Sequence, residues 1–170
     1  NVALTESNQP YIKLDLRGLS YNPSQAEIIR KIEHAFNQLN KKWQTKIQTA
    51  LKQVKGVSIL GNSINLDWSR QGTDLTHLFD TVNHWAENNQ VKFLIAFDEI
   101  QLIRGEKSIP RLFAHIIDYN QNICLIVSGS EIGLLFDFLG FENPESPLYG
   151  RYYTEITMHP FTPEEPKEYL

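Results

Sequence analysis

The stretch FLIAFDE, residues 93–99, decides the fold of this chain. Five consecutive apolar residues are typical of a central strand that is covered on both sides, as strands of parallel sheets are. Two carboxylates, Asp98 and Glu99, follow at once. In an open parallel sheet, ligands bind beyond the carboxyl ends of the strands. The stretch therefore predicts a buried strand with two acidic side chains at the edge where ligands bind.

Strand and helix patterns alternate on both sides of this stretch. Residues 11–16 alternate with the period of two that a strand shows, and Ser24 with Glu27 predicts a capped helix start. The other predicted strands are residues 123–127 and 154–158. The predicted helices are residues 24–54 with a break near Asn40, 74–86, 109–120 and 131–139, and a small β-hairpin insertion is predicted at about 57–68. Strands separated by helices imply an α/β fold, with a mostly parallel sheet flanked by helices on both faces.

Composition narrows the class of protein. A chain of 170 residues suits one domain, so residues 1–170 are taken as a single domain. The net charge of -4 argues against a chain-wide surface for nucleic acid. The single cysteine, Cys124, lies in an apolar run, which predicts a small buried side chain and no disulfide. The lack of an apolar run of about 20 residues and of a signal-peptide pattern predicts a cytoplasmic protein with no membrane partner.

The two carboxylates suit magnesium and water chemistry. An aspartate at a strand end can hold Mg²⁺ through oxygen or through a bound water, and Asp98 is the candidate. Glu99, on the opposite side of the strand end, can orient and deprotonate a water that attacks a γ-phosphate. The alternative is a polar strand terminus, because Asp and Glu often begin turns.

Polar residues also follow the second buried strand and precede the last predicted one. Ser128 and Ser130 lie beside the carboxylates if the two buried strands are neighbours, and a hydroxyl there can bond the attacking water or a phosphate oxygen. The alternative is a serine cap for the helix at 131–139. Arg151 could stabilise charge on a transferred phosphoryl group, as an arginine finger does. A surface arginine in a turn is the ordinary alternative.

Four motifs, in order, resemble the archaeal-type ATPase family, a branch of the AAA+ and STAND P-loop ATPases. They are FDEIQ at 97–101, SGSEIGLL at 128–135, SPLYGR at 146–151, and PFTPEE at 160–165 followed by EYL at 168–170. The resemblance implies a P-loop NTPase-like core that binds ATP and Mg²⁺, with Asp98 and Glu99 as the Walker B pair. The resemblance implies three catalytic residues: Glu99 as the base, Ser128 as the sensor and Arg151 as the arginine finger. It also implies that Asp98, Gln101 and Ser130 bind the nucleotide. Asp98 would in addition hold Mg²⁺ through a bound water.

The glycine-rich phosphate loop of that family is absent from the chain. In such a loop the glycines expose backbone N–H groups to the phosphates, and a Lys and a Ser or Thr serve the γ-phosphate and Mg²⁺. Residues 105–108, GEKS, are the nearest match, but they follow the acidic strand and have Glu between Gly and Lys. Residues 1–6 resemble the end of the helix after such a loop, and the family's winged-helix part would follow Leu170. The sequence is therefore interpreted as an ATPase core trimmed at both ends.

Three functions remain open on this interpretation. The first is Mg-dependent ATP hydrolysis by the full-length protein, coupled to a conformational output. The second is a nucleotide-gated switch, as STAND relatives are thought to be, in which ATP or ADP holds a conformation and turnover is slow. The third is a non-enzymatic α/β scaffold. An unknown protein partner or self-association is expected, and nucleic acid could bind only through the absent C-terminal part.

These 170 residues by themselves are expected to bind Mg-ATP weakly. Most phosphate contacts in this class come from the absent loop, and two carboxylates repel phosphate. A dissociation constant in the millimolar range or weaker follows, which is about 4 kcal/mol of binding free energy or less. Calorimetric titration of Mg-ATP measures it, and micromolar binding would contradict the interpretation.

Overall fold

Three parallel strands form the central sheet of the computed structural model, which describes residues 8–67, 69 and 72–158. Both strand pairings place Asp15, Asp98 and Ser128 side by side at the carboxyl edge of the sheet. The strands predicted at these positions are confirmed. In sheet order they are β1 (Tyr11–Asp15), β4 (Phe93–Asp98) and β5 (Ile123–Ser128).

The helices begin at polar caps. Ser24 and Glu27 form the predicted capping box, and Asp74 caps the helix that follows the hairpin. The predicted break near Asn40 is confirmed, because the Asn40 side chain accepts from the N–H of Lys42 and starts a second helix. No helix in the described residues is long and apolar enough to cross a membrane. The helices are α2 (Gln25–Asn37), α3 (Lys41–Leu51), α4 (Leu75–Asn88), α5 (Ser108–Tyr119) and α6 (Ile132–Leu139), with a 3₁₀ helix η1 (Ile100–Ile103) after β4.

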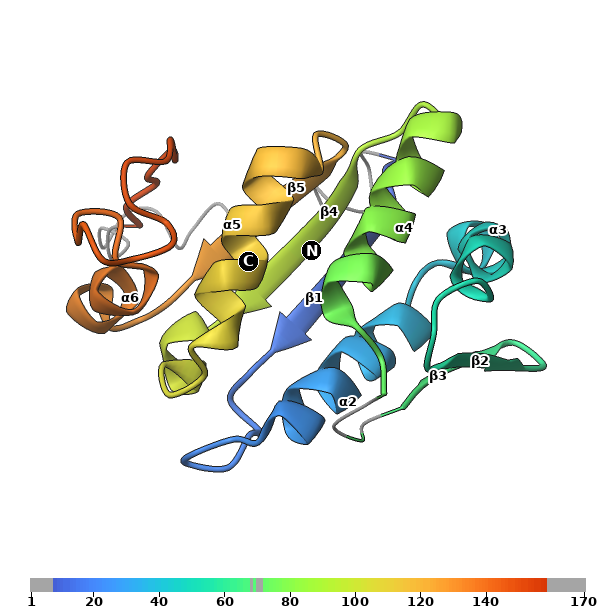
Figure 1. The fold of residues 1–170 in the computed structure, drawn as a ribbon, viewed down its shortest axis with the longest axis horizontal. Helices are drawn as coiled ribbons and strands as arrows, with labels where there is room; N and C mark the ends of the chain where they lie inside the picture. Colours follow the sequence, from blue (N-terminus) through green and yellow to red (C-terminus); the bar gives the residue numbers. More distant parts are fainter. Residues whose placement is uncertain (1–7, 68, 70–71, 159–170) are drawn as a thin grey trace, which may run out of the picture.

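The long helices α2, α4 and α5 lie on the same face of the sheet (Figure 1), and aromatic rings pack them against it. Phe36 of α2 and Trp85 of α4 both lie against Phe93 of β4, with ring centroids 6.1 Å and 6.3 Å apart. Phe113 of α5 lies 5.0 Å from Phe97, also on β4. Because Phe93 and Phe97 are four positions apart on one strand, they point to the same face. The core therefore lies between this face and the three helices.

The opposite face of the sheet is less covered. Leu94 and Ala96 of β4 are half-buried there, and their neighbours Cys124 and Ile126 on β5 are exposed. The predicted α/β class with flanking helices is confirmed, but helices on both faces are not found within the described residues. The prediction that Cys124 is buried is wrong, because the long helices that are described lie on the other side of its strand.

The predicted hairpin is confirmed as β2 (Val57–Leu60) paired antiparallel with β3 (Ser63–Leu66). Gly61 turns the chain with a φ of 59°, a left-handed conformation that glycine adopts at little cost. Asn37 of α2 fixes the inner strand. Its Nδ2 donates to the Ile64 carbonyl at 2.7 Å, and its Oδ1 accepts from the Ile64 N–H at 2.8 Å. Ile64 is fully buried, so the hairpin contributes to the core.

No strand forms at residues 154–158, where the sequence predicts one. Residues 151–158 lack regular secondary structure, and Ile156 and Met158 are 81% and 84% exposed. An extended segment becomes a strand only when a neighbouring strand satisfies its backbone groups. In the part of the chain that is described, this segment has no such neighbour. The patterns at residues 1–6, 160–165 and 168–170 lie outside the described residues.

Phe36→Ala is expected to destabilise the protein by about 3–5 kcal/mol, the cost typical of deleting a buried phenylalanine ring. Phe36 is fully buried and lies against both Phe79 and Phe93, so its removal leaves a cavity. Urea unfolding followed by circular dichroism measures the change. Tyr21→Ala is the control, because this ring is 85% exposed and its loss should cost less than about 0.5 kcal/mol. Equal effects of the two substitutions would contradict the packing.

Candidate active site

Backbone geometry at the end of β4 separates the two carboxylates. Asp98 is the last strand residue and is in register with Ser128 of β5. Glu99 has a left-handed backbone with φ 60° and ψ 47°, which costs a residue with a side chain roughly 1–2 kcal/mol. Such strain persists only where the surrounding structure holds it, and it is common at functional sites. The turn ends the strand and starts η1 directly after the carboxylates.

Asp98 lies between a hydroxyl and a cation. The Ser128 hydroxyl donates to Oδ1 at 2.7 Å, and the Lys13 ammonium lies 3.0 Å from Oδ2. The Arg17 guanidinium is 3.9 Å from the same Oδ2. The Ser128 hydrogen bond, followed by that of Lys13, holds the pKa of Asp98 below its ordinary value. Asp98 is therefore a carboxylate at neutral pH, as a metal ligand must be.

Glu99 accepts its hydrogen bonds from neutral groups. The Ser130 hydroxyl donates to Oε2 at 2.8 Å, the Ser130 N–H at 3.3 Å, and the Gln101 amide at 2.5 Å. The Ser130 hydroxyl is the largest cause, ahead of Gln101, of a Glu99 pKa below its ordinary value. All three bonds end on the same oxygen. The carboxylate is thus held from one side.

Five of the six predicted site residues come together at this edge. They are Asp98, Glu99, Gln101, Ser128 and Ser130, linked by the hydrogen bonds above. Gln101 and Ser130 were predicted to contact the nucleotide, and in the structure both bond Glu99. Gln101 is 1% exposed, so its amide serves the carboxylate from within the protein. Ser128 and Ser130 were also considered as caps for α6, and neither caps it, because the N-cap residue is Glu131.

Arg151 lies elsewhere. Its guanidinium donates to both oxygens of Asp118, through Nε at 2.9 Å and Nη2 at 2.6 Å, and also to the Pro147 carbonyl. Asp118 is in the last turn of α5, which leads into the start of β5. The start of β5 is at the opposite edge of the sheet from Ser128. The structure therefore does not bring Arg151 to the carboxylates.

The sequence did not indicate Lys13 and Arg17 as site residues. Lys13 points from β1 to the same face as Asp98, because residues 13 and 15 of β1 alternate with the buried Ile12 and Leu14. Arg17 donates to Asp15 through Nε and Nη2 at 2.9 Å and 2.7 Å, and this bond lowers the pKa of Asp15. The one indication in the sequence was Lys13, a charged residue within the predicted strand. It becomes informative only once β1 is known to pair with β4.

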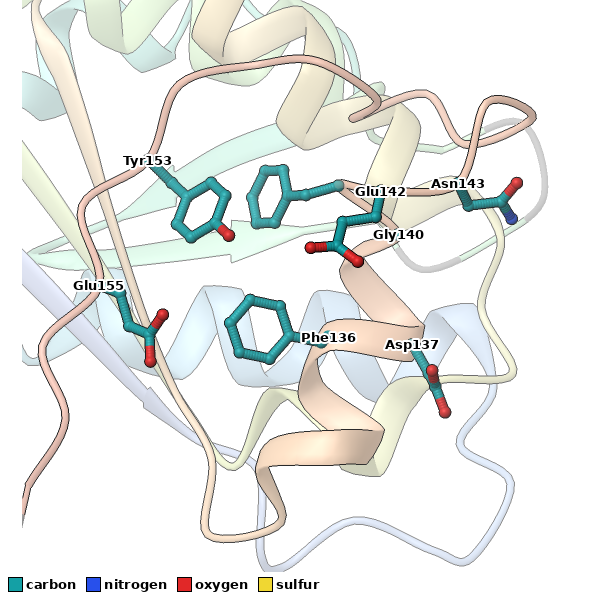
Figure 2. Close-up of a pocket in the computed structure, with 8 residues that line it drawn as sticks. Phe136, Asp137, Gly140, Glu142, Asn143, Tyr153 and Glu155 are labelled. Atoms are coloured by element: carbon teal, nitrogen blue, oxygen red, sulfur yellow. The ribbon is translucent and has the colours of Figure 1, made fainter.

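A separate hollow of about 580 Å³ lies between α6 and the segment after it (Figure 2). Phe136, Phe141 and Tyr153 form its aromatic part, with Tyr153 stacked on Phe141 at 4.3 Å between centroids. Its lining also includes three carboxylates, those of Asp137, Glu142 and Glu155. It contains none of the six predicted residues. No Lys or Arg is among the described residues that line it, so, unlike the strand-end site with Lys13 and Arg17, it offers no positive charge to a phosphate.

The oxygen atoms at the strand ends suit a magnesium ion that keeps part of its water shell, rather than a metal bound by protein side chains alone. The described residues contain no group of three His, Cys, Asp or Glu side chains able to hold a metal ion. Mg²⁺ does not require one, because it keeps several waters and binds one or two carboxylates together with substrate phosphates. The ionised Asp98 beside the Ser128 hydroxyl provides oxygen donors of that kind. The residues present therefore fit this cation.

Asp118→Asn is expected to lower stability at neutral pH, and the effect should vanish in acid. The Arg151 hydrogen bonds hold the pKa of Asp118 below its ordinary value of 3.8. A lowered carboxyl pKa stabilises the fold above that ordinary value, and this stability is lost as the pH falls through the folded pKa. Urea midpoints of both proteins between about pH 7 and about pH 2 measure the difference. A difference that stays constant over this range would contradict the ion pair, and Asp137→Asn on α6 is the control.

Comparison with known proteins supports the fold. No family model matches the chain, and no curated protein matches it. Among solved structures, the Walker-type ATPase PABY2304 of Pyrococcus abyssi matches with a TM-score of 0.64 and 30% sequence identity over 88% of this chain. The chain spans 41% of the length of that protein. It therefore has a P-loop NTPase-like α/β fold, similar to that of a Walker-type ATPase.

Proposed function

We propose that the full-length protein binds ATP with Mg²⁺ and hydrolyses the γ-phosphate at the end of β4. One observation carries the proposal: two ionised carboxylates, Asp98 and Glu99, lie at the carboxyl edge of a parallel sheet with separate hydrogen-bond partners. The likeness to a Walker-type ATPase supports ATP as the nucleotide. The left-handed backbone of Glu99 agrees with the proposal, because such strain is common at functional sites.

Asp98 would hold Mg²⁺ through a bound water. Both of its oxygens already accept bonds, from Ser128 and from Lys13, so a water-mediated contact disturbs the site least. When bound, the cation neutralises charge on the β- and γ-phosphates. The Ser128 hydroxyl donates to Asp98 and would sense a phosphate bound beside it. These roles agree with oxygen ligation of a hard cation.

Glu99 would accept the proton of the attacking water. The water oxygen forms a bond to the γ-phosphorus, the bond from that phosphorus to the bridging oxygen of ADP breaks, and the proton passes to Glu99. The lowered pKa keeps Glu99 ionised at neutral pH but also makes it a weaker base. Glu99 would therefore both orient the water and take its proton as the phosphoryl group moves.

Arg151 needs a rearrangement before it can act as a finger. Its two bonds to Asp118 occupy the fork of the guanidinium that would bind a phosphate. A finger role in the same molecule would require those bonds to break and the segment after α6 to move to the other edge of the sheet. If Arg151 of a second copy acted as the finger, it too would first have to break its bonds to Asp118 of its own chain.

A nucleotide-gated switch is the second candidate, and one contact favours it. Lys13 on β1 bonds the aspartate that Mg²⁺ would use, at 3.0 Å. In a switch, a cation that binds Asp98 directly would compete with this ammonium. Nucleotide binding would then break the ion pair between Lys13 of β1 and Asp98 of β4. A nucleotide-dependent change in oligomer size with slow turnover would support the switch. Fast turnover by a monomer would support the hydrolase.

Glu99→Gln in the full-length protein is expected to leave ATP binding nearly intact and to lower kcat by a factor on the order of 10² or more, the scale of losing a general base. The amide is isosteric but cannot take the proton. Steady-state phosphate release and equilibrium ATP binding measure the two effects separately. Glu142→Gln, a carboxylate in the α6 hollow, is the matched control and should leave kcat unchanged. Hydrolysis by Glu99→Gln at the original rate would remove Glu99 from the mechanism.

A further inference from the structure

The carboxamide of Gln101 is enclosed between Glu99 and Gly129. Its side chain is 1% exposed. The Nε2 group donates to Glu99 Oε2 at 2.5 Å. The Oε1 atom is buried and has no hydrogen-bond partner among the described residues. An apolar side chain of similar size would fill this space without an unsatisfied acceptor, so packing alone does not account for an amide here.

The orientation of the amide is set by Glu99. A flip would bring Oε1 against the carboxylate oxygen and remove the only hydrogen bond that the side chain donates to it. The unsatisfied Oε1 is therefore the consequence of keeping Nε2 on Glu99. The amide is held in the direction that serves the carboxylate.

Gly129 supplies the room that Gln101 occupies. A Cβ atom at position 129 would lie 2.4 Å from Gln101 Oε1 and 3.2 Å from its Cδ. Gly129 does not have a left-handed φ, so backbone conformation does not explain the glycine. The close approach of Gln101 does. The SGS sequence at 128–130 thus combines a hydroxyl on Asp98, a space for Gln101 and a hydroxyl on Glu99.

We propose that Gln101 is a positioning residue for Glu99, and that Gly129 is required because it makes room for Gln101. This inference rests on the proposed function, in which Glu99 orients the attacking water. Gln101 and Ser130 together hold Oε2, so Oε1 is the oxygen directed to the water. Because Gln101 is 1% exposed, it would contact neither the nucleotide nor the water directly.

A double-mutant cycle in the full-length protein tests the proposal. Q101A and G129A are each expected to lower kcat by roughly 10- to 100-fold, the scale for misplacing a catalytic group, with little change in the KM for ATP. In Q101A no carboxamide remains for a Cβ to displace. The double variant Q101A/G129A should therefore be no slower than Q101A alone. Q101M, which keeps the side-chain volume but has no donor, should resemble Q101A.

Asn120→Ala is the matched control. Asn120 is another buried carboxamide, 3% exposed, that donates to a carboxylate, Asp80, at 2.9 Å. Its Oδ1 also lacks a partner within the described residues. The substitution removes a comparable amide near the start of β5, away from the carboxyl edge of the sheet, so it should reduce stability without lowering kcat. A similar loss of kcat in Asn120→Ala would assign the Gln101 effect to general destabilisation.

A second readout does not depend on hydrolysis. The side-chain carboxyl ¹³C resonance of Glu99, identified by its absence in E99Q, should shift in Q101A and in G129A and stay in place in Asn120→Ala. If E99Q lowers kcat but Q101A and G129A do not, the positioning role is wrong and the proposed function stands. If E99Q hydrolyses ATP at the original rate, the proposed function fails and the inference fails with it. A G129A effect that persists in the Q101A background would overturn the role given to Gly129.

Discussion

The register in which β1, β4 and β5 pair is the constraint on which the strand-end site depends. It aligns Asp15, Asp98 and Ser128 in one row. A shift of one residue would turn every side chain of a strand to the other face, moving Phe93 and Phe97 out of the core. Those rings are buried against α2, α4 and α5, so the core fixes the register. The geometry of the carboxylates is thus a consequence of how the aromatic rings pack.

The two adjacent carboxylates, Asp98 and Glu99, remain ionised because each accepts hydrogen bonds from its own set of partners. The charge of Asp98 raises the pKa of Glu99, but the hydrogen bonds from Ser130 and Gln101 outweigh that repulsion. Asp98 has a charged neighbour, Lys13, in addition to a hydroxyl. A carboxylate whose oxygens already accept bonds is suited to hold a hydrated cation through water. A carboxylate held only by neutral donors is suited to orient a water. In the reaction proposed for the full-length protein, the two residues would therefore take different parts.

Helices cover the two faces of the sheet unequally in the described residues. Its long helices bury one face, while Cys124 and Ile126 on the other face are exposed. Parallel sheets in α/β proteins usually have both faces covered. β5 has one strand neighbour in the described residues, and the segment at 154–158 has none. Ile156 and Met158 in this segment are exposed because an extended segment forms a sheet only when a neighbouring strand accepts and donates its backbone hydrogen bonds.

Local patterns in the sequence determined the elements, and tertiary structure determined the partners. The apolar run before Asp98, the capping box at Ser24 and the turn at Gly61 act over a few residues, so the strand, helix and hairpin could be predicted from them. Parallel strands end at one edge of a sheet, so the sequence could place Asp98 and Glu99 at the same edge as Ser128 and Ser130. That they lie beside each other depends on β4 pairing with β5, which the structure shows.

The partners of those side chains depend on contacts between residues far apart in the chain. Lys13 reaches Asp98 across 85 positions only because β1 pairs with β4. Arg151 is bound to Asp118 on α5, and the amide of Gln101 can lie against Glu99 because Gly129 of another segment leaves room for it. No periodicity encodes such pairings, since each requires the register and packing of the whole sheet. The sequence by itself therefore determined which chemical groups stand at the strand ends, and only the tertiary structure decided which of them hold one another.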